Sequence, residues 1–398
     1  MSEAPASLIL RIHTRLTEIP AIAWNACARP DTPSPSGEMN PSLSHHFLAS
    51  LEQSGTVSPE TGWAPHHLAV EHNNEVIAVA PAYLKAHSMG EYVFDHSWAD
   101  AYERAGGRYY PKLQLAVPFT PIPGGRFLAR TGPHSMAAQD LLITSIARLV
   151  ERNGLSSAHA TFLPQAECLR ASQHGFLQRQ DQQFHWHNQG YRTFDDFLDA
   201  LASRKRKAIR RERRQALQAA ITIERLTGSD ITEAHWDAFF SFYMDTSARK
   251  WGRPYLNRLF FSLIGQRMSE QILLVMARRD GRYIAGALNL IGSHALYGRN
   301  WGALEHHPFL HFELCYYQAI DFAIERGLRR VEAGAQGEHK LARGYLPSPT
   351  YSAHYIANAG FRRAVAAYLE RERSAVDDMI ETLTELGPFR RGAAEVDS

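Results

Sequence analysis

Runs of β-forming hydrophobic residues bounded by polar turn residues are clearest in the second half of the chain. Two β-rich runs, residues 272–279 (ILLVMARR) and 282–291 (RYIAGALNLI), are joined by an Asp-Gly turn, and residues 294–301 follow a Gly-Ser turn. This pattern predicts a three-stranded antiparallel meander. An amphipathic helix should follow, because apolar residues recur on one helical face before a terminating Gly327 and a further strand: Phe312, Tyr316, Ala319, Ile320 and Ala323.

The first half of the chain repeats this order of elements. Leu68–His72 and Glu75–Lys85 flank an Asn-Asn turn, and the β-rich run Gly90–Trp98 follows, which predicts a second meander. A helix that stops at Gly154 and a strand come next. The step from Trp98 to Gly154 is 56 residues, against 26 from Trp301 to Gly327, so we expect an insertion rich in Tyr, Pro and Gly in the first half.

The repeat predicts an α+β protein built from two tandem copies of one unit. Residues 1–188 would form the first domain and 189–398 the second, each with a mixed, mainly antiparallel sheet flanked by helices. A strand in SLILRIH, helices near IPAIAWNACA and at 43–53, and a long C-terminal helix complete the prediction. A doubly wound dinucleotide-binding fold is rejected, because no G-x-G-x-x-G follows a strand.

The composition predicts a soluble globular protein. The 398 residues are 44% hydrophobic and 21% charged, and the formal net charge of +2 is too small to indicate nucleic acid or membrane as a partner. Cys27, Cys168 and Cys315 are far apart, which favours a reducing compartment. With no leader and no apolar run approaching the ~18 residues of a membrane span, we expect a cytoplasmic protein without stable membrane insertion.

The densest charged segment is Ser203–Arg214, with eight cations in twelve residues on a predicted helix. A solvated helix face is one interpretation. The self-repulsion of such a run favours a nearby anion, and the phosphates of coenzyme A, a tRNA backbone or a nucleotide-linked acceptor would all serve. A membrane surface is a weaker alternative. The candidate binding residues in this run are Arg204, Lys205, Arg206 and Arg210.

A second concentration of functional groups is the Gly-rich segment Val331–Tyr345, directly after a predicted strand. A group-transfer site needs a base, hydrogen-bond donors for developing negative charge and sometimes an acid. Candidate bases are Glu332, Glu338 and His339. Tyr297 or Tyr345 could serve as acid, and Gln336 and Arg343 are candidate binding residues. An ordinary exposed loop is the alternative.

The whole chain, from LSHHFLASLE through GEYVFDHSWADAY and SRKRKAIRRER to AGAQGEHKLARGY, resembles the FemAB-like family of predicted bacterial N-acyltransferases. The resemblance implies tandem GCN5-related acyltransferase domains of the Fem type. A Lys followed by a Gly after the last helix and strand is similar to the family's C-terminal motif. Lys340 and Gly344 take these places, His339 stands where an aromatic is usual, and the resemblance implies that Lys340 stabilises the oxyanion.

Further binding residues are expected where the two meanders end. Asp95, His96 and Trp98 end the first, and Arg299 and Trp301 end the second, and equivalent positions of a duplicated fold could line a shared cleft. Core packing of both Trp residues is the alternative. A loop residue, Arg253, is a candidate for an acceptor carboxylate.

No cofactor or metal ion is expected to be permanently bound. The usual pyrophosphate motif of coenzyme A sites is missing from the start of the second crossover helix, so the donor is open between acyl-CoA and aminoacyl-tRNA. The 20 His residues form no recognised metal motif.

These observations predict an N-acyltransferase. The group moved would be acyl or aminoacyl, and the acceptor a small-molecule or peptide amine such as a cell-envelope or peptidoglycan precursor, with tRNA as a possible partner. The alternative is a non-catalytic module of the same fold that recognises an envelope precursor or RNA.

Overall fold

The computed structural model describes residues 7–28, 39–250, 254–334 and 337–390. Contacts divide the chain into two compact units: unit 1 is Met1–Asp181 with Pro349–Asp377, and unit 2 is Gln182–Ser348 with Asp378–Ser398. The division into domains 1–188 and 189–398 stays a prediction. Residues 349–377, which it places in the second domain, belong to unit 1.

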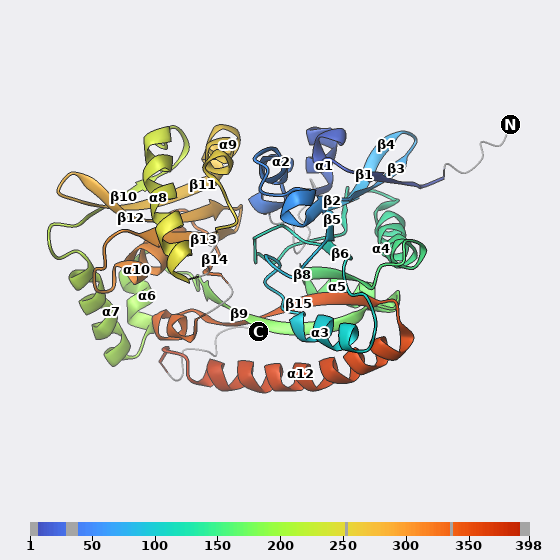
Figure 1. The fold of residues 1–398 in the computed structure, drawn as a ribbon. Helices are drawn as coiled ribbons and strands as arrows, with labels where there is room; N and C mark the ends of the chain where they lie inside the picture. Colours follow the sequence, from blue (N-terminus) through green and yellow to red (C-terminus); the bar gives the residue numbers. More distant parts are fainter. Residues whose placement is uncertain (1–6, 29–38, 251–253, 335–336, 391–398) are drawn as a thin grey trace. The chain divides into compact units, whose positions relative to one another are not determined.

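A mixed sheet forms the centre of unit 2 (Figure 1). Its first four strands pair antiparallel, β13 and β14 pair in parallel, and the end of β9 pairs antiparallel with β14. The meander predicted from the Asp-Gly turn is therefore confirmed. The strands are β10 (Thr222–Leu226), β11 (Ile272–Arg279), β12 (Arg282–Ile291), β13 (Ala295–Ala303), β14 (Arg330–Glu332) and β9 (Leu177–His187).

Side-chain alternation gives this sheet two buried faces. Leu273, Val275 and Ala277 belong to the core that includes helix α11. On the other face, helix α8 comes so close to the sheet that a Cβ at Gly302 would lie 2.2 Å from the Phe242 carbonyl oxygen. Glycine is required there. The helices are α6 (Phe194–Ala200), α7 (Ser203–Ala216), α8 (Glu233–Lys250), α9 (Arg258–Met268), α10 (Leu310–Phe312) and α11 (Gln318–Glu325).

The predicted helix before Gly327 is present, with one feature that the pattern did not indicate. Between α10 and α11 the backbone forms a π-helical turn, Glu313–Tyr317, and such turns occur frequently at functional sites. Gly327 has φ +63°, as the predicted helix end requires. Short 3-10 turns occupy Gly228–Asp230, Ser269–Gln271 and Glu338–Arg343.

Unit 1 contains a sheet with the same order of pairing. In this sheet the first two pairs of neighbouring strands are antiparallel, the third pair is parallel and the fourth is antiparallel. The strands β11, β12, β13, β14 and β9 of unit 2 pair in the same way. The tandem α+β fold is thereby confirmed. The strands are β2 (Trp63–Pro65), β5 (Ala82–Lys85), β6 (Lys112–Leu115), β8 (Ser157–Leu163) and the end of β15 (Leu346–Ile356).

A second, smaller sheet of unit 1 has the order β1-β3-β4-β7, and helix α4 packs on it. The predicted N-terminal strand and the helices near residues 21–28 and 43–53 are present. These elements are β1 (Ile9–His13), β3 (His67–His72), β4 (Glu75–Ala80), β7 (Leu128–Ala129), α1 (Ala21–Ala28), α2 (His45–Gln53), α3 (His96–Arg104), α4 (Ser135–Arg152) and α5 (Gln165–Gln173), with 3-10 turns at Leu16–Glu18, Pro41–Leu43 and Pro59–Thr61.

The predicted meander of the first half is wrong in two places. Residues 90–98 form no strand: helix α3 begins at His96, and the strand in this position of the sheet is β6. The run Glu75–Lys85 is divided between two sheets, because Pro81 has no N–H group to continue a ladder. The insertion predicted after Trp98 therefore contains a core strand.

Each unit receives its last strand from the other half of the sequence. β9 follows the elements of unit 1 but ends against β14, and β15 follows those of unit 2 but ends against β8.

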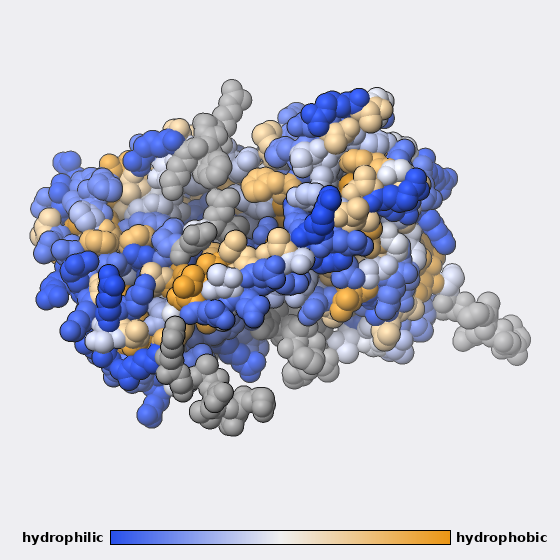
Figure 2. Space-filling view, turned by 90° about the horizontal axis from the view of Figure 1, so that it is seen from below, coloured by the Kyte–Doolittle hydropathy of each residue, from blue (hydrophilic) through white to orange (hydrophobic). Residues whose placement is uncertain are grey.

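The predicted C-terminal helix is present as α12 (Ala359–Glu385). No helix among the described residues is long and apolar enough to cross a membrane. The surface shown in Figure 2 is mostly hydrophilic, with small apolar areas.

Candidate functional site

The parallel pair β13 and β14 opens a site at the end of the short strand. Pairing covers only three positions and ends at Tyr297 and Glu332, while β13 continues to Ala303. A bulge that leaves Arg299 outside the register marks the change. Gly298 permits close approach, since a Cβ there would lie 3.3 Å from the Glu332 carbonyl oxygen. The chain therefore leaves the sheet at Glu332 and forms the Gly-rich loop predicted to carry the chemistry.

Glu332 lies at the end of β14 and is only 3% exposed. Arg330 Nε donates a 2.8 Å hydrogen bond to Glu332 Oε1, and His185 Nε2 of β9 lies 4.0 Å from Oε2. Burial, with the charges of Arg330 and Lys340, lowers the pKa of His185 to about 3, so its imidazole is neutral at pH 7. The Glu332 carboxylate thus pairs with the Arg330 guanidinium and has the neutral imidazole of His185 beside it.

Lys340 is buried in the 3-10 turn that follows the loop. Its side chain is held by a 2.9 Å hydrogen bond from Nζ to the Gly334 carbonyl oxygen. Burial lowers the pKa of Lys340 to about 8, so the ammonium form dominates at pH 7. The three predicted glycines have positive φ: Gly334 +80°, Gly337 +116° and Gly344 +89°. The Lys340 side chain therefore links the 3-10 turn to the start of the loop at Gly334.

Arg343 ties this turn to the basic helix α7. Its Nη2 donates to both carboxylate oxygens of Glu212 at 3.0 Å, and its Nη1 donates to the His339 carbonyl oxygen at 2.6 Å. The Tyr317 hydroxyl also donates to Glu212. His339 is exposed and its Nε2 lies 2.9 Å from the Tyr316 hydroxyl. Arg343 therefore positions the turn rather than facing solvent.

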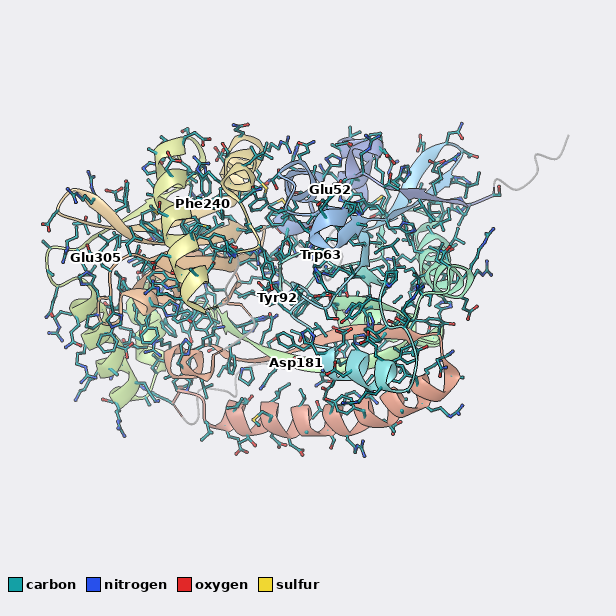
Figure 3. The ribbon with its side chains drawn as sticks, viewed as in Figure 1. Glu52, Trp63, Tyr92, Asp181, Phe240 and Glu305 are labelled. Carbon is teal, nitrogen blue, oxygen red and sulfur yellow. The ribbon has the colours of Figure 1, made fainter. Side chains whose placement is uncertain are left out.

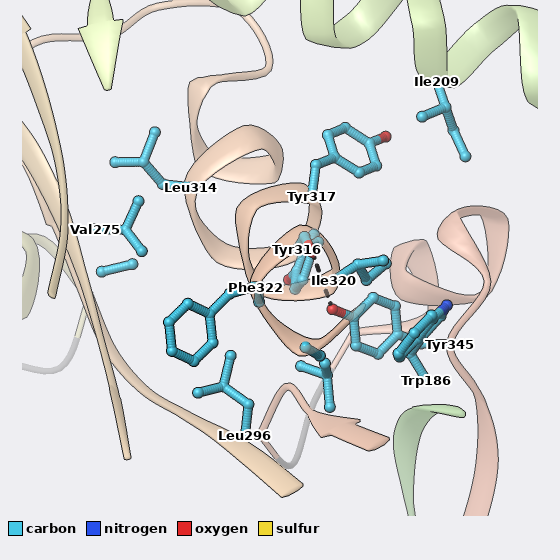
Figure 4. Close-up of a cluster of buried hydrophobic side chains, with 14 of the residues drawn as sticks. Trp186, Ile209, Val275, Leu296, Leu314, Tyr316, Tyr317, Ile320, Phe322 and Tyr345 are labelled. Atoms are coloured by element: carbon cyan, nitrogen blue, oxygen red, sulfur yellow. Dashed lines mark hydrogen bonds between the residues drawn. The ribbon is translucent and has the colours of Figure 1, made fainter. Parts of the chain in front are cut away.

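The two tyrosines considered as acids lie in the core. Tyr345 is fully buried beside Trp186, and its hydroxyl donates to the Tyr316 carbonyl oxygen at 3.3 Å (Figure 4). Burial raises the pKa of Tyr345 well above its ordinary value. Tyr297 is 1% exposed, opposite Glu332 in the strand register. Their acid roles stay predictions.

The side chains of three predicted site residues are not described by the structure. Gln336 and Arg253 lie outside the described residues, and of Glu338 only the backbone is described. Their roles stay predictions.

Several cations of helix α7 are paired with carboxylates of unit 2. Arg206 contacts Asp199 at 2.7 Å, Arg210 contacts Asp195 at 2.9 Å, and Arg213 contacts the fully buried Glu313 at 3.0 Å. Part of the charge that suggested a bound anion is thus balanced within the protein. Four further cations of α7 are exposed, and their spacing places them on one side of the helix: Arg204, Lys207, Arg211 and Arg214. We call these four residues the exposed stripe. The fourth predicted binding residue of this helix, Lys205, is half-buried.

A pocket of about 370 Å³ lies beside the end of β13. It includes the predicted binding residue Trp301, while Arg299 is not among its lining residues. Glu305, labelled in Figure 3, marks its position near α10. The lining residues are Thr246, Arg249, Trp301, Ala303, Glu305, His306, His307, Phe309, Leu310, His311 and Phe312.

The predicted binding residues of the first half lie elsewhere, in unit 1. Asp95 is 2% exposed; its Oδ2 accepts hydrogen bonds from Lys112 Nζ at 2.6 Å and from the Tyr109 hydroxyl at 2.7 Å. His96 is exposed at the start of α3, and Trp98 is buried with Arg179 5.1 Å from its ring. Asp95 therefore belongs to a buried ion-pair network, and its substrate role stays a prediction.

Sequence reasoning missed His185, Arg330 and Glu212 as members of the site. His185 and Arg330 reach Glu332 only through strand pairing between β9 and β14, which local patterns do not reveal. Glu212 had a signal, because it is the single acid within the basic run. No group of three or more His, Cys, Asp or Glu suited to a metal ion occurs in the described part of the chain.

Comparison with known proteins gives a family and a fold. A sequence model of the FemAB-like family, described as peptidoglycan biosynthesis/recognition, matches residues 15–391. No curated protein matches. The crystal structure of FemX is similar with a TM-score of 0.52 and 12% identity, over 90% of this chain and 100% of that one. The structure of L-PGS from Bacillus licheniformis is similar with a TM-score of 0.50 and 9% identity, over 86% and 96%.

Proposed function

Because the chain belongs to the FemAB-like family, we propose that it is an N-acyltransferase that moves an acyl or aminoacyl group to an amine of a cell-envelope precursor. The donor would be acyl-CoA or aminoacyl-tRNA. One observation carries the proposal: a buried carboxylate, Glu332, and a buried lysine, Lys340, lie on either side of one Gly-rich loop, at the point where two parallel strands part. Amide synthesis needs a cation for the oxyanion and a base for the amine.

The proposed reaction is one addition and one elimination. The amine nitrogen attacks the acyl carbonyl carbon, a C–N bond forms, and the carbonyl electron pair moves to oxygen, where the Lys340 ammonium stabilises the charge. Glu332 accepts the proton that the amine nitrogen loses. Collapse re-forms the carbonyl, breaks the bond to sulfur or to the ribose oxygen, and the proton passes to that leaving group. Arg330, which donates a 2.8 Å hydrogen bond to Glu332 Oε1, orients the carboxylate.

The pH dependence of the transfer rate should reflect the protonation of Lys340. With a pKa of about 8, a lysine required as the ammonium form loses its proton as the pH rises through 8, so the wild-type rate should fall above that pH. Lys340→Arg keeps its charge there, and the decline should move beyond pH 10. The measurement is kcat/KM between pH 6 and 10 for both proteins, because this ratio reports the pKa values of the free enzyme. An identical decline in the two would remove Lys340 as its source.

Changing the exposed stripe of α7 can distinguish the two possible donors experimentally. If the donor is an aminoacyl-tRNA, changing Arg204, Lys207, Arg211 and Arg214 together to Gln should lower the slope of log Kd against log salt by about 3. Fluorescence anisotropy of a labelled tRNA measures this slope. Arg282→Gln with Arg326→Gln, two exposed cations elsewhere in unit 2, is the matched control. Unchanged RNA binding in the fourfold variant would favour acyl-CoA.

A further inference from the structure

Glu212 is the single acid within the basic run of helix α7, and its side chain is only 13% exposed. Its carboxylate accepts hydrogen bonds from Arg343 Nη2, at 3.0 Å to each oxygen, and from the Tyr317 hydroxyl. Figure 4 shows this hydroxyl pointing toward the helix of Ile209, which is α7. Glu212 is therefore the point at which α7 reaches the 3-10 turn Glu338–Arg343, which we call the Lys340 turn.

Arg343 extends this contact to the peptide bond that precedes Lys340. Its Nη1 donates to the His339 carbonyl oxygen at 2.6 Å. The N–H of the same peptide bond belongs to Lys340 and donates to the Gly337 carbonyl oxygen at 3.1 Å. Because a peptide unit is planar, holding both of its polar atoms fixes the direction in which the Lys340 side chain leaves the backbone. The Arg343 guanidinium also lies 3.4 Å from the centre of the Phe312 ring, which limits its own movement.

The Lys340 turn needs such support, because a glycine stands at each end of it. Gly337 has φ +116° and Gly344 has φ +89°, and glycine leaves the backbone more freedom than any other residue. Among the ion pairs in the described part of the chain, Arg343–Glu212 is the one that joins this turn to a helix. Its hydrogen bonds are charge-assisted and so about twice as strong as neutral ones.

The residues around Glu212 fix the helix from which it acts. Arg213 pairs with Glu313 of the π-helical turn at 3.0 Å and with Asp321 of α11 at 2.7 Å. Ile209, one helical turn earlier, is 2% exposed in the core of unit 2. Helix α7 is thus held on both sides of Glu212, and the carboxylate has a fixed backbone behind it.

We propose that Glu212 is a positioning residue of the transfer reaction: through Arg343 it holds the peptide bond before Lys340, and so aims the ammonium group at the oxyanion. The inference rests on the proposed function, in which Lys340 stabilises that oxyanion. Such stabilisation depends on donors that are already in place when the charge develops. Glu212 touches no reacting atom, and its whole effect passes through Arg343.

Hydrogen exchange of the full chain, followed by mass spectrometry, tests the positioning without any transfer reaction. Glu212→Gln keeps the shape of the side chain and removes its charge. Amides in peptides that cover residues 337–345 should exchange about tenfold to a hundredfold faster than in the wild type, the equivalent of one lost hydrogen bond to a charged group. Peptides of β11 and β12 should exchange as before. Glu325→Gln, which removes the partner of Arg225 in a more exposed ion pair of unit 2, is the matched control and should exchange as the wild type does.

Steady-state kinetics separate positioning from general stability. Glu212→Gln should lower kcat by about tenfold to a hundredfold, the cost of a displacement of up to about 1 Å. The KM for the donor should not change, because the contact that Glu212 aims forms only in the transition state. Arg343→Lys keeps a charge but loses the planar fork that holds two partners, so kcat should fall by a similar factor. The double variant should lose no more than Arg343→Lys alone, since the two residues act as one unit.

The proposal is overturned if the Lys340 turn of Glu212→Gln exchanges as in the wild type, or if exchange rises throughout unit 2. It is also overturned if kcat of Glu212→Gln equals that of the wild type, or if the losses of the two single variants add in the double variant. Because hydrogen exchange needs no turnover, a wild-type protein that transfers nothing would refute the proposed function, while a loosened turn in Glu212→Gln would still show that Glu212 holds the Lys340 turn.

Discussion

Lys340→Met is expected to lower the turnover of acyl transfer by about 10²- to 10³-fold, the usual effect of removing one oxyanion donor. Met is unbranched, is one atom shorter than Lys and fills most of the same buried space, so the turn that Lys340 occupies should persist. The Michaelis constant for the donor should change little, since the lost interaction forms only in the transition state. Steady-state rates of product formation by mass spectrometry give both quantities.

The control for this variant is Arg278→Met, which removes a partly exposed cation at the end of β11. It should retain wild-type turnover. If Lys340→Met, with its fold intact by circular dichroism, turned over as fast as the control, Lys340 would not stabilise the oxyanion.

Asp95→Ala is expected to lower the free energy of unfolding by about 3–5 kcal/mol, the usual loss when one partner of a buried ion pair is removed. Lys112, 1% exposed, would keep Glu91 as its remaining carboxylate at 3.3 Å and lose the shorter contact to Asp95. Burial acts against the charged form, yet the Lys112 ammonium holds the pKa of Asp95 well below its usual value. Urea unfolding followed by tryptophan fluorescence measures the loss.

An exposed ion pair provides the comparison. Asp237, whose side chain is 73% exposed, pairs with Arg258, and Asp237→Ala should change the free energy of unfolding by less than about 1 kcal/mol. An Asp95→Ala protein of wild-type stability but with a raised Michaelis constant for the acceptor would contradict the network assignment. It would support instead the substrate role predicted from the sequence.

The sequence predicted those elements whose signals are local. The strands of the second meander are β-rich runs separated by Asp-Gly and Gly-Ser turns, so β11, β12 and β13 could be identified directly. The third strand of unit 1 could not, because β6 has only four residues, and the alternation in KLQL is too short to be distinctive after Pro111. The aromatic run before it, which resembles a strand, leads into helix α3 instead.

The candidate site likewise contains residues that local sequence patterns predicted and residues that they did not. Glu332 and Lys340 are close in sequence, and their shared loop was visible as a density of ionisable groups after a strand. His185 joins them through pairing of β9 with β14, across almost 150 residues of sequence. Charge density alone also overstated the need for a ligand at α7, because Asp199 and Glu313 come from other segments to neutralise Arg206 and Arg213.

The most direct test of the account is a mass-shift assay on the folded wild-type protein. The protein is incubated with CoA thioesters or charged tRNA and with an amine-bearing envelope precursor, and the mass of the precursor is recorded. The account predicts that one donor adds its acyl or aminoacyl group to the amine. A folded protein that binds the precursor but transfers nothing from either donor would contradict it, and would identify the chain as a binding module of this fold.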